Sequence, residues 1–424
     1  MNTSSISQPR LRRAALGAGA LLLLLTLSSC GYSSNPGYYQ VDVPNSIAVA
    51  DVNGDGVPDL LVATTADQGL PFNPGFANVI LGNAGSPGTY KGGTGYQIQG
   101  TNPSSIAVAD IYGTGNGPLD LAVANYGSGN VSLFMHGASP GTFNQAVTVN
   151  SGGSPNQIVA VDLNGDGHVD FVLGDLSCSG FVIVLLQNGA SPGTFLAPMN
   201  LLTAAGWGVP SAQAADLSGG KGPPDIVAAA FDANGNNGSV YVFLHNPASP
   251  GTFLAPVRFP AGAQPQSVKI ADVNGDGLPD LIVANQGPGT DGTGTAGVSV
   301  LLQDPAHPYS FLAPVTYATP GFSIDVAVGT LSNNPKAPPD LVVANLSPSQ
   351  TGSISVLLHD PAHPGQFLAA TSYTGFGQPL GVAIADLNLD GYPDIAVADG
   401  QSAVVMLQSS ATPGTFQQGV QVGN

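Results

Sequence analysis

The sequence predicts an all-β protein: one seven-bladed β-propeller of four-stranded antiparallel blades, placed after an export signal. Three observations support this. Glycine (58) and proline (36) make up about a fifth of the 424 residues and glutamate is absent, so long helices are disfavoured. The apolar residues fall in short runs of Val, Ile, Leu and Ala between turn formers, as in many short strands. A unit of about 50 to 60 residues recurs seven times from Asn45 onward.

The N-terminal residues are typical of an export signal rather than of a folded domain. A basic region with Arg10, Arg12 and Arg13 precedes an apolar stretch over 21–25. The segment Leu27-Ser-Ser-Cys30 then resembles a bacterial lipobox, which implies cleavage before Cys30 and a lipid on its sulfur. We therefore expect a lipoprotein signal peptide over 1–29, a lipidated cysteine and tether over 30–43, and the propeller over 44–424.

The lipobox also sets the expected location and redox chemistry. The protein is expected to be exported and anchored to the bacterial cell envelope, at the outer membrane, on its periplasmic or surface side. The alternative is an ordinary secretory signal that contains a cysteine. With Cys30 lipidated, Cys178 is the remaining thiol, and no intramolecular disulfide is expected.

Each repeated unit predicts four strands. The first alternates, as in IAVADV from Ile47, and the second is almost wholly apolar, as in LLVAT from Leu60, so we expect it to be buried on both faces. A third strand follows, as in VYVFL from Val240. A Ser-Pro-Gly-Thr-Phe turn then leads to a fourth, outer strand such as FLAPVTY from Phe311. Four strands in seven units favour a propeller over an open β-solenoid, whose repeats are usually shorter.

Four units carry an acidic loop between the first and second strands. Its pattern is Asp-x-Asn-x-Asp-Gly-x-x-Asp, with oxygen-bearing side chains at positions 1, 3, 5 and 9 and a glycine for the sharp turn at position 6. Calcium takes six to eight oxygen ligands, and the carbonyl of position 7 supplies another. The predicted ligands are Asp51, Asn53, Asp55, Val57, Asp59; Asp162, Asn164, Asp166, His168, Asp170; Asp272, Asn274, Asp276, Leu278, Asp280; Asp386, Asn388, Asp390, Tyr392 and Asp394.

Two other interpretations of these loops fit the sequence less well. Asp, Asn and Gly form turns in any tight connection, but three carboxylates within nine residues would repel one another without a cation. Magnesium is disfavoured because it prefers rigid octahedral geometry and retained water. The pattern is lost in the units with Asp110–Asp120 and Asp216–Asp225, and in the unit where Gly329 replaces the first Asp. We therefore expect about four Ca²⁺ ions.

Units such as SIAVADVNGDGVPDLLVAT, followed by VSVLLQ and FLAPVTY in a later unit, resemble FG-GAP repeats of the VCBS type. Integrin α-subunit propellers contain a similar calcium loop. The resemblance covers nearly all of the chain after residue 44. It implies an adhesion or ligand-binding role and a ligand face opposite the calcium loops.

The expected ligand face is built by the loops after the second and fourth strands. Aromatic residues in those loops suit stacking against a sugar or a peptide side chain. They are Phe72, Phe76, Tyr126, Trp207, Phe322 and Phe376. Each ring could instead cap the hydrophobic core.

These features predict a binding or adhesion module for a glycan, peptide or partner protein. A structural subunit of a surface complex and a carbohydrate-active enzyme such as a polysaccharide lyase are the alternatives. Nucleic acid is a poor partner for a net charge of -18, and membrane contact is expected through the lipid only. Because few acid-base residues are present, no catalytic residues are assigned and the chain is expected not to be an enzyme.

Overall fold

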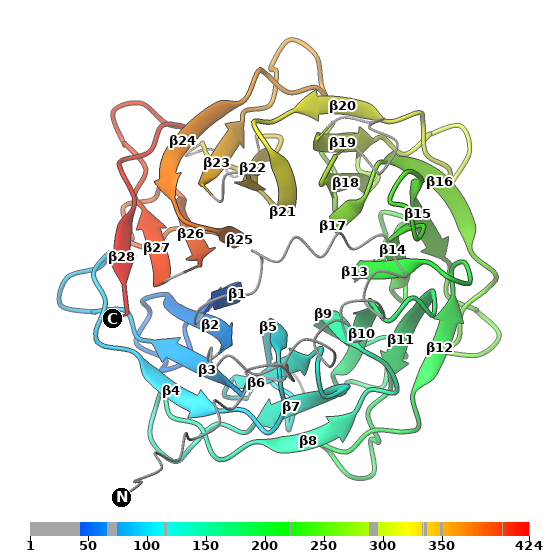
Figure 1. The fold of residues 1–424 in the computed structure, drawn as a ribbon, viewed down its shortest axis with the longest axis horizontal. Coiled ribbons are helices and arrows are strands. Elements are labelled where there is room, and N and C mark those ends of the chain that lie inside the picture. Colours follow the sequence, from blue (N-terminus) through cyan, green and yellow to red (C-terminus); the bar gives the residue numbers. More distant parts are fainter. Residues whose placement is uncertain are drawn as a thin grey trace, which may run out of the picture.

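The computed structural model describes residues 43–424 except 66–73, 114–116, 221, 288–295, 333, 335–336, 348–350, 401 and 424. Its strands form seven four-stranded antiparallel sheets, arranged as blades around a central axis (Figure 1). Within each sheet the strands follow sequence order from the axis to the rim. No helix occurs within these described ranges. The predicted all-β, seven-bladed propeller is confirmed.

The two inner strands of each blade come from the predicted apolar runs. The first strands are β1 (Val43–Ala50), β5 (Pro103–Ala109), β9 (Pro155–Val161), β13 (Gly208–Ala215), β17 (Pro265–Ala271), β21 (Phe322–Gly329) and β25 (Pro379–Ala385). The second strands are β2 (Asp59–Thr65), β6 (Asp120–Asn125), β10 (Asp170–Asp175), β14 (Asp225–Phe231), β18 (Asp280–Asn285), β22 (Asp340–Leu346) and β26 (Asp394–Asp399). The second strands are buried along nearly their whole length, as a strand with neighbours on both faces must be.

The two outer strands differ in burial. The third strands are β3 (Gly75–Ile80), β7 (Asn130–Phe134), β11 (Phe181–Leu185), β15 (Gly238–Phe243), β19 (Gly297–Leu301), β23 (Gly352–Leu357) and β27 (Ser402–Met406). The fourth strands are β4 (Thr94–Gln97), β8 (Val147–Asn150), β12 (Met199–Leu202), β16 (Val257–Gly262), β20 (Val315–Ala318), β24 (Thr371–Phe376) and β28 (Val420–Val422). Most fourth-strand residues are exposed.

The fourth strands are shorter than predicted. The expected strand from Phe311 begins only at Val315, and Phe311 instead makes a single bridge with Gln303. The same single bridge recurs in all seven blades, at the phenylalanine or tyrosine that ends each turn.

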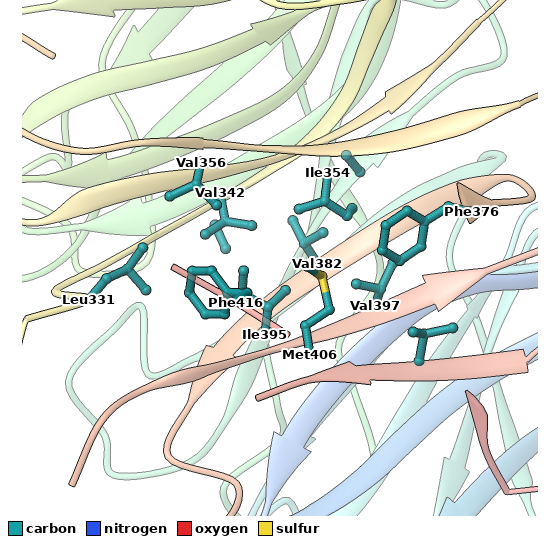
Figure 2. Close-up of a cluster of buried hydrophobic side chains, with 13 residues drawn as sticks. Leu331, Val342, Ile354, Val356, Phe376, Val382, Ile395, Val397, Met406 and Phe416 are labelled. Atoms are coloured by element: carbon teal, nitrogen blue, oxygen red, sulfur yellow. The ribbon is translucent and has the colours of Figure 1, made fainter. Parts of the chain in front are cut away.

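The hydrophobic core consists of seven clusters, each packed between two neighbouring blades. Figure 2 shows the cluster between the sixth and seventh blades, where Val342, Ile354 and Val356 meet Ile395 and Met406. A single blade therefore leaves both of its faces uncovered without its neighbours.

The ring closes through packing between the seventh blade and the first. Ile47, Leu60 and Val62 of the first blade share a cluster with Leu387 and Ala396 of the seventh. The C-terminal strand β28 is the outermost strand of the seventh blade, so each blade is built from four consecutive strands. In the part of the chain that the structure describes, no helix has the length and apolar character needed to span a membrane.

The structure differs from the sequence prediction at Cys178, which is disulfide-bonded rather than an unpaired thiol. Cys30, the predicted lipidation site, lies outside the described residues, as do the predicted signal peptide and the tether up to residue 42.

Candidate metal centres

The four acidic loops all join a first strand to a second strand, and therefore lie on one face of the propeller. Each turns through two residues with left-handed backbone, at positions 4 and 6. In the first loop these are Gly54 (φ 74°) and Gly56 (φ 83°). The sequence analysis identified only the glycine at position 6. In the fourth loop, position 4 is Leu389 (φ 60°), a conformation that an L-residue with a large side chain rarely adopts.

The first aspartate of each loop is held by backbone amides. Asp51 accepts hydrogen bonds from the N–H of Gly54 (2.7 Å) and Asp55 (3.2 Å) on one oxygen and from Gly56 (2.8 Å) on the other. Asn53 Oδ1 accepts from the Asp55 amide at 2.8 Å, and Asp55 Oδ1 accepts from Val57 at 3.0 Å. The pattern is close to the same in the other three loops.

The aspartate at position 9 has a second role that the sequence analysis missed. One oxygen of Asp59 accepts from the Val52 amide of its own loop (2.9 Å), and the other accepts from the amide of Gly82, which follows the third strand (2.8 Å). All seven blades repeat this pair of hydrogen bonds, at 2.8–3.1 Å and 2.7–2.8 Å respectively. The seven aspartates are Asp59, Asp120, Asp170, Asp225, Asp280, Asp340 and Asp394, all almost fully buried. We call them the tie aspartates.

The tie aspartates of the four acidic loops have raised pKa values. Burial is the main cause, the two backbone hydrogen bonds oppose it, and the loop carboxylates at positions 1 and 5 raise the pKa further. The pKa of Asp280 rises to about 7, those of Asp170 and Asp394 rise to about 6, and that of Asp59 is raised in the same direction. In each acidic loop, the surrounding groups therefore do not fully stabilise the negative charge of the ionised carboxylates.

The donor set of these loops fits a hard cation. Each loop offers three carboxylates, one amide oxygen and a backbone carbonyl, the oxygen donors that calcium takes. Within the described residues, no three His, Cys, Asp or Glu side chains converge in a metal-holding arrangement. The loop carboxylates are turned toward backbone amides instead.

The degenerate loops satisfy their first aspartate differently. Asp216 accepts hydrogen bonds from the Ser218 amide (2.8 Å) and hydroxyl (2.6 Å) and from the Gly222 amide (2.6 Å). Burial alone would raise its pKa, but these bonds outweigh it and lower the pKa. A cation is not needed to hold this loop.

The aromatic residues of the predicted ligand face are dispersed. Phe376 is 6% exposed and belongs to the core shown in Figure 2, which corrects the prediction that its ring is displayed. Phe76 and Phe322 lie in strands and Tyr126 follows one, all half-buried. Trp207 packs edge-on against Tyr241, with the Arg258 guanidinium 4.9 Å from its ring centre. Phe72 lies outside the described residues.

A groove of about 470 Å³ runs along the rim between the first and second blades. Tyr96, Gln97 and Gln99 line it from the first blade and Phe134, Asn144 and Gln145 from the second. Blades three to six carry Leu-Ala at the positions of Asn144-Gln145, and those leucines are about half exposed. The amide-rich groove is therefore a local feature rather than a property of the repeat.

Comparison with known proteins identifies the repeats. The FG-GAP-like repeat model matches residues 113–173, 220–283 and 339–397, and the FG-GAP repeat model matches 43–96. Together these segments cover more than half of the chain. No curated protein sequence matches.

Two solved propellers resemble this one in fold. A periplasmic gluconolactonase from Pseudomonas aeruginosa matches with a TM-score of 0.57 at 18% identity, over 86% of this chain and 97% of its own. A putative 6-phosphogluconolactonase from Bacteroides fragilis matches with a TM-score of 0.55 at 14% identity, over 86% and 95%. These matches contradict the prediction that the chain is not an enzyme, which rested on the small number of acid-base residues, because propellers of this fold include proteins described as lactonases. At such identities the likeness shows the fold alone.

Proposed function

We propose, because this chain belongs to the FG-GAP repeat family, that it is a calcium-stabilised, lipid-anchored binding module of the bacterial cell envelope. Calcium would be held by positions 1, 3 and 5 of the four acidic loops, by the carbonyl of position 7 and by the tie aspartate at position 9. When bound, the ion would supply positive charge to a loop that carries three carboxylates.

The observation that carries the calcium proposal is the burial of four tie aspartates beside two further carboxylates each. Asp59, Asp170, Asp280 and Asp394 are 0% exposed. None of the ion pairs formed among the described residues involves them. A buried carboxylate without a counter-charge is costly, and a divalent cation bound only by the folded chain would offset that cost.

The residues of each acidic loop have distinct structural roles. The left-handed residues at positions 4 and 6, glycines except for Leu389, turn the backbone so that its amides hold the first aspartate. The tie aspartate connects the loop to the residue after the third strand. A cation in the loop would therefore fix three strands of one blade relative to one another.

Replacing Asp276 with Ala tests this proposal. The variant is expected to bind one calcium ion fewer than the wild type, measured by titration calorimetry after chelation, with a lower calcium-dependent melting temperature. Asp304→Asn is the matched control, because it removes one charge from the same blade outside the loop. An unchanged ion count in Asp276→Ala would reject the site.

The rim groove supports recognition of a neutral glycan. Its amide side chains donate and accept hydrogen bonds as vicinal hydroxyls require, while Tyr96 and Phe134 offer apolar surface for sugar C–H groups. A volume of about 470 Å³ is within the range of small-ligand sites. The groove lacks charged side chains among its lining residues, which disfavours an ionic ligand.

The double substitution Asn144→Leu with Gln145→Ala tests glycan binding. It installs the residues that four other blades carry, so folding is expected to be preserved. Binding on a neutral glycan array should be lost in this variant and retained in Gln418→Ala, an amide on the seventh blade. Glycan binding that survives the substitution would exclude the groove, and a protein partner or a purely structural role would then be favoured.

The lipid anchor is tested by chemistry at Cys30. In the mature protein from its native membrane, Cys30 should be the N-terminal residue and should carry diacylglycerol by mass spectrometry. A mature N-terminus with an unmodified Cys30 would reject the anchor.

A second candidate function is lactone hydrolysis, which one small cavity favours. His359, Asp360 and Pro338 line a cavity of about 160 Å³. Asp340 Oδ1 lies 2.8 Å from His359 Nδ1 and orients the ring, which leaves Nε2 for proton transfer. Hydrolysis of gluconolactone that is lost in His359→Gln but kept in His136→Gln would support this role, and turnover no faster than in buffer would reject it.

A further inference from the structure

The residue that follows the third strand differs between two sets of blades. Blades one, three, five and seven have Gly82, Gln187, Gln303 and Gln408 there. Blades two, four and six have His136, His245 and His359. In all seven, the backbone N–H of this residue donates to the tie aspartate.

The three histidines add a side-chain contact that the glutamines do not make. Nδ1 of His136, His245 and His359 lies 2.8, 3.0 and 2.8 Å from Oδ1 of its tie aspartate. Those aspartates are Asp120, Asp225 and Asp340, exposed by no more than 2%.

The glutamines bind elsewhere in the loop. Gln303 Nε2 donates to the carbonyl of Pro279 at 2.8 Å, and its Oε1 accepts from the Tyr309 amide at 3.3 Å. Gln187 repeats this arrangement with Val169 and Gly193. These side chains thus connect the loop to the following turn and leave the tie aspartate without a side-chain donor.

The histidines occur in the three blades whose loops have lost the acidic pattern, and in none of the four that keep it. We propose that His136, His245 and His359 take the place of calcium as the partner of the buried tie aspartate, so that this position determines which blades bind metal. The inference rests on the proposed calcium function. The propeller would then contain two kinds of blade. In one, the partner of the tie aspartate is a metal ion, and in the other it is an imidazole.

Charge explains why the two partners exclude each other. An imidazole that carries its proton supplies one positive charge at hydrogen-bond distance from the carboxylate. The same imidazolium in an acidic loop would stand beside a divalent cation and repel it. The charged groups facing each ring are its own tie aspartate and, for His359, also Asp360.

The three histidine rings that make this contact are partly exposed to solvent. The side chains of His136, His245 and His359 are 36%, 26% and 21% exposed.

The first test replaces His245 with Gln, the residue that three sibling blades carry. In metal-free buffer the melting temperature should fall by about 2–4 °C, because the buried tie aspartate loses its side-chain partner. The calcium count should not change. His136→Gln should show the same fall, so that a folding defect peculiar to one blade is not mistaken for the effect. An unchanged melting temperature in both variants would overturn the proposal.

The converse substitution, Gln303→His, places the imidazole in a calcium blade. It should reduce the number of calcium ions by one, while Gln303→Asn, which has no ring, should keep them all. Retention of every ion in Gln303→His would overturn the exclusion. If the wild type binds no calcium, the proposed function fails, whereas the His245→Gln result in metal-free buffer still decides whether the imidazole stabilises its aspartate.

Discussion

Removing divalent cations is expected to make the stability of this protein fall as the pH rises from about 4 to about 7. The pKa of the Asp280 carboxyl is raised from 3.8 to about 7, and burial is the main cause. Asp170 and Asp394 are raised to about 6 in the same way. Between those values the folded chain keeps protons that the unfolded chain has released. Their contribution is therefore complete below the unfolded pKa and is lost as the pH rises through the folded pKa.

The size of the effect follows from these pKa values. One pH unit of difference corresponds to about 1.4 kcal/mol, so Asp280 alone contributes on the order of 4 kcal/mol to the fall. Asp170 and Asp394 act in the same direction. Calcium should reverse the trend, because it competes with protons for the same oxygens and binds more tightly once they have left.

Urea unfolding followed by the fluorescence of Trp207, the one tryptophan of the chain, measures this profile. Curves are needed in chelator and in calcium, at pH values of about 4.5, 6 and 7.5. A parallel series in about 0.5 M salt screens the general repulsion of a net charge of -18 and leaves the buried groups largely unaffected. A metal-free stability that is level or rises over this range would refute the reasoning. So would a calcium effect of equal size at the lowest and highest pH.

Three further predictions concern single positions. Leu389→Gly should raise the free energy of unfolding by about 1 kcal/mol, because it relieves a left-handed leucine that is half exposed; a loss of stability in urea would contradict this. Asp340→Ala should lower the free energy of unfolding by about 3 kcal/mol, because the buried amides of Leu331 and His359 lose their acceptor. It should leave the calcium count unchanged. A loss below about 1 kcal/mol would show that these two hydrogen bonds do not stabilise the blade. Arg258→Ala should expose Trp207 and shift its emission to the red, since the guanidinium covers its ring; an unshifted spectrum would show that the ring is shielded by other groups.

The fold was predictable because burial in a propeller leaves a strong periodic signal. The apolar second strands and the alternating first strands are visible in the sequence, and they lie where expected. The start of the outer strand was not predictable, because the residues from Phe311 onward suggest one continuous strand, whereas the ladder begins only at Val315.

The residue types of the site were predictable from the sequence, but the structural role of each residue was not. The loop pattern indicated Asp59 as a metal ligand, whereas its hydrogen bonds to Val52 and Gly82 require coordinates. A signal was present, since an aspartate begins the second strand even in the degenerate units. Phe376 could not be assigned to the core from sequence, because a single aromatic ring in a loop-rich segment carries no periodicity.

The most direct test of the account is the calcium content of the folded protein after dialysis against calcium and removal of the unbound ion. Elemental analysis should find about four ions per chain, one for each intact acidic loop, and chelation should lower the melting temperature at neutral pH. A chain that holds no calcium and melts at the same temperature with and without chelator would contradict the central claim.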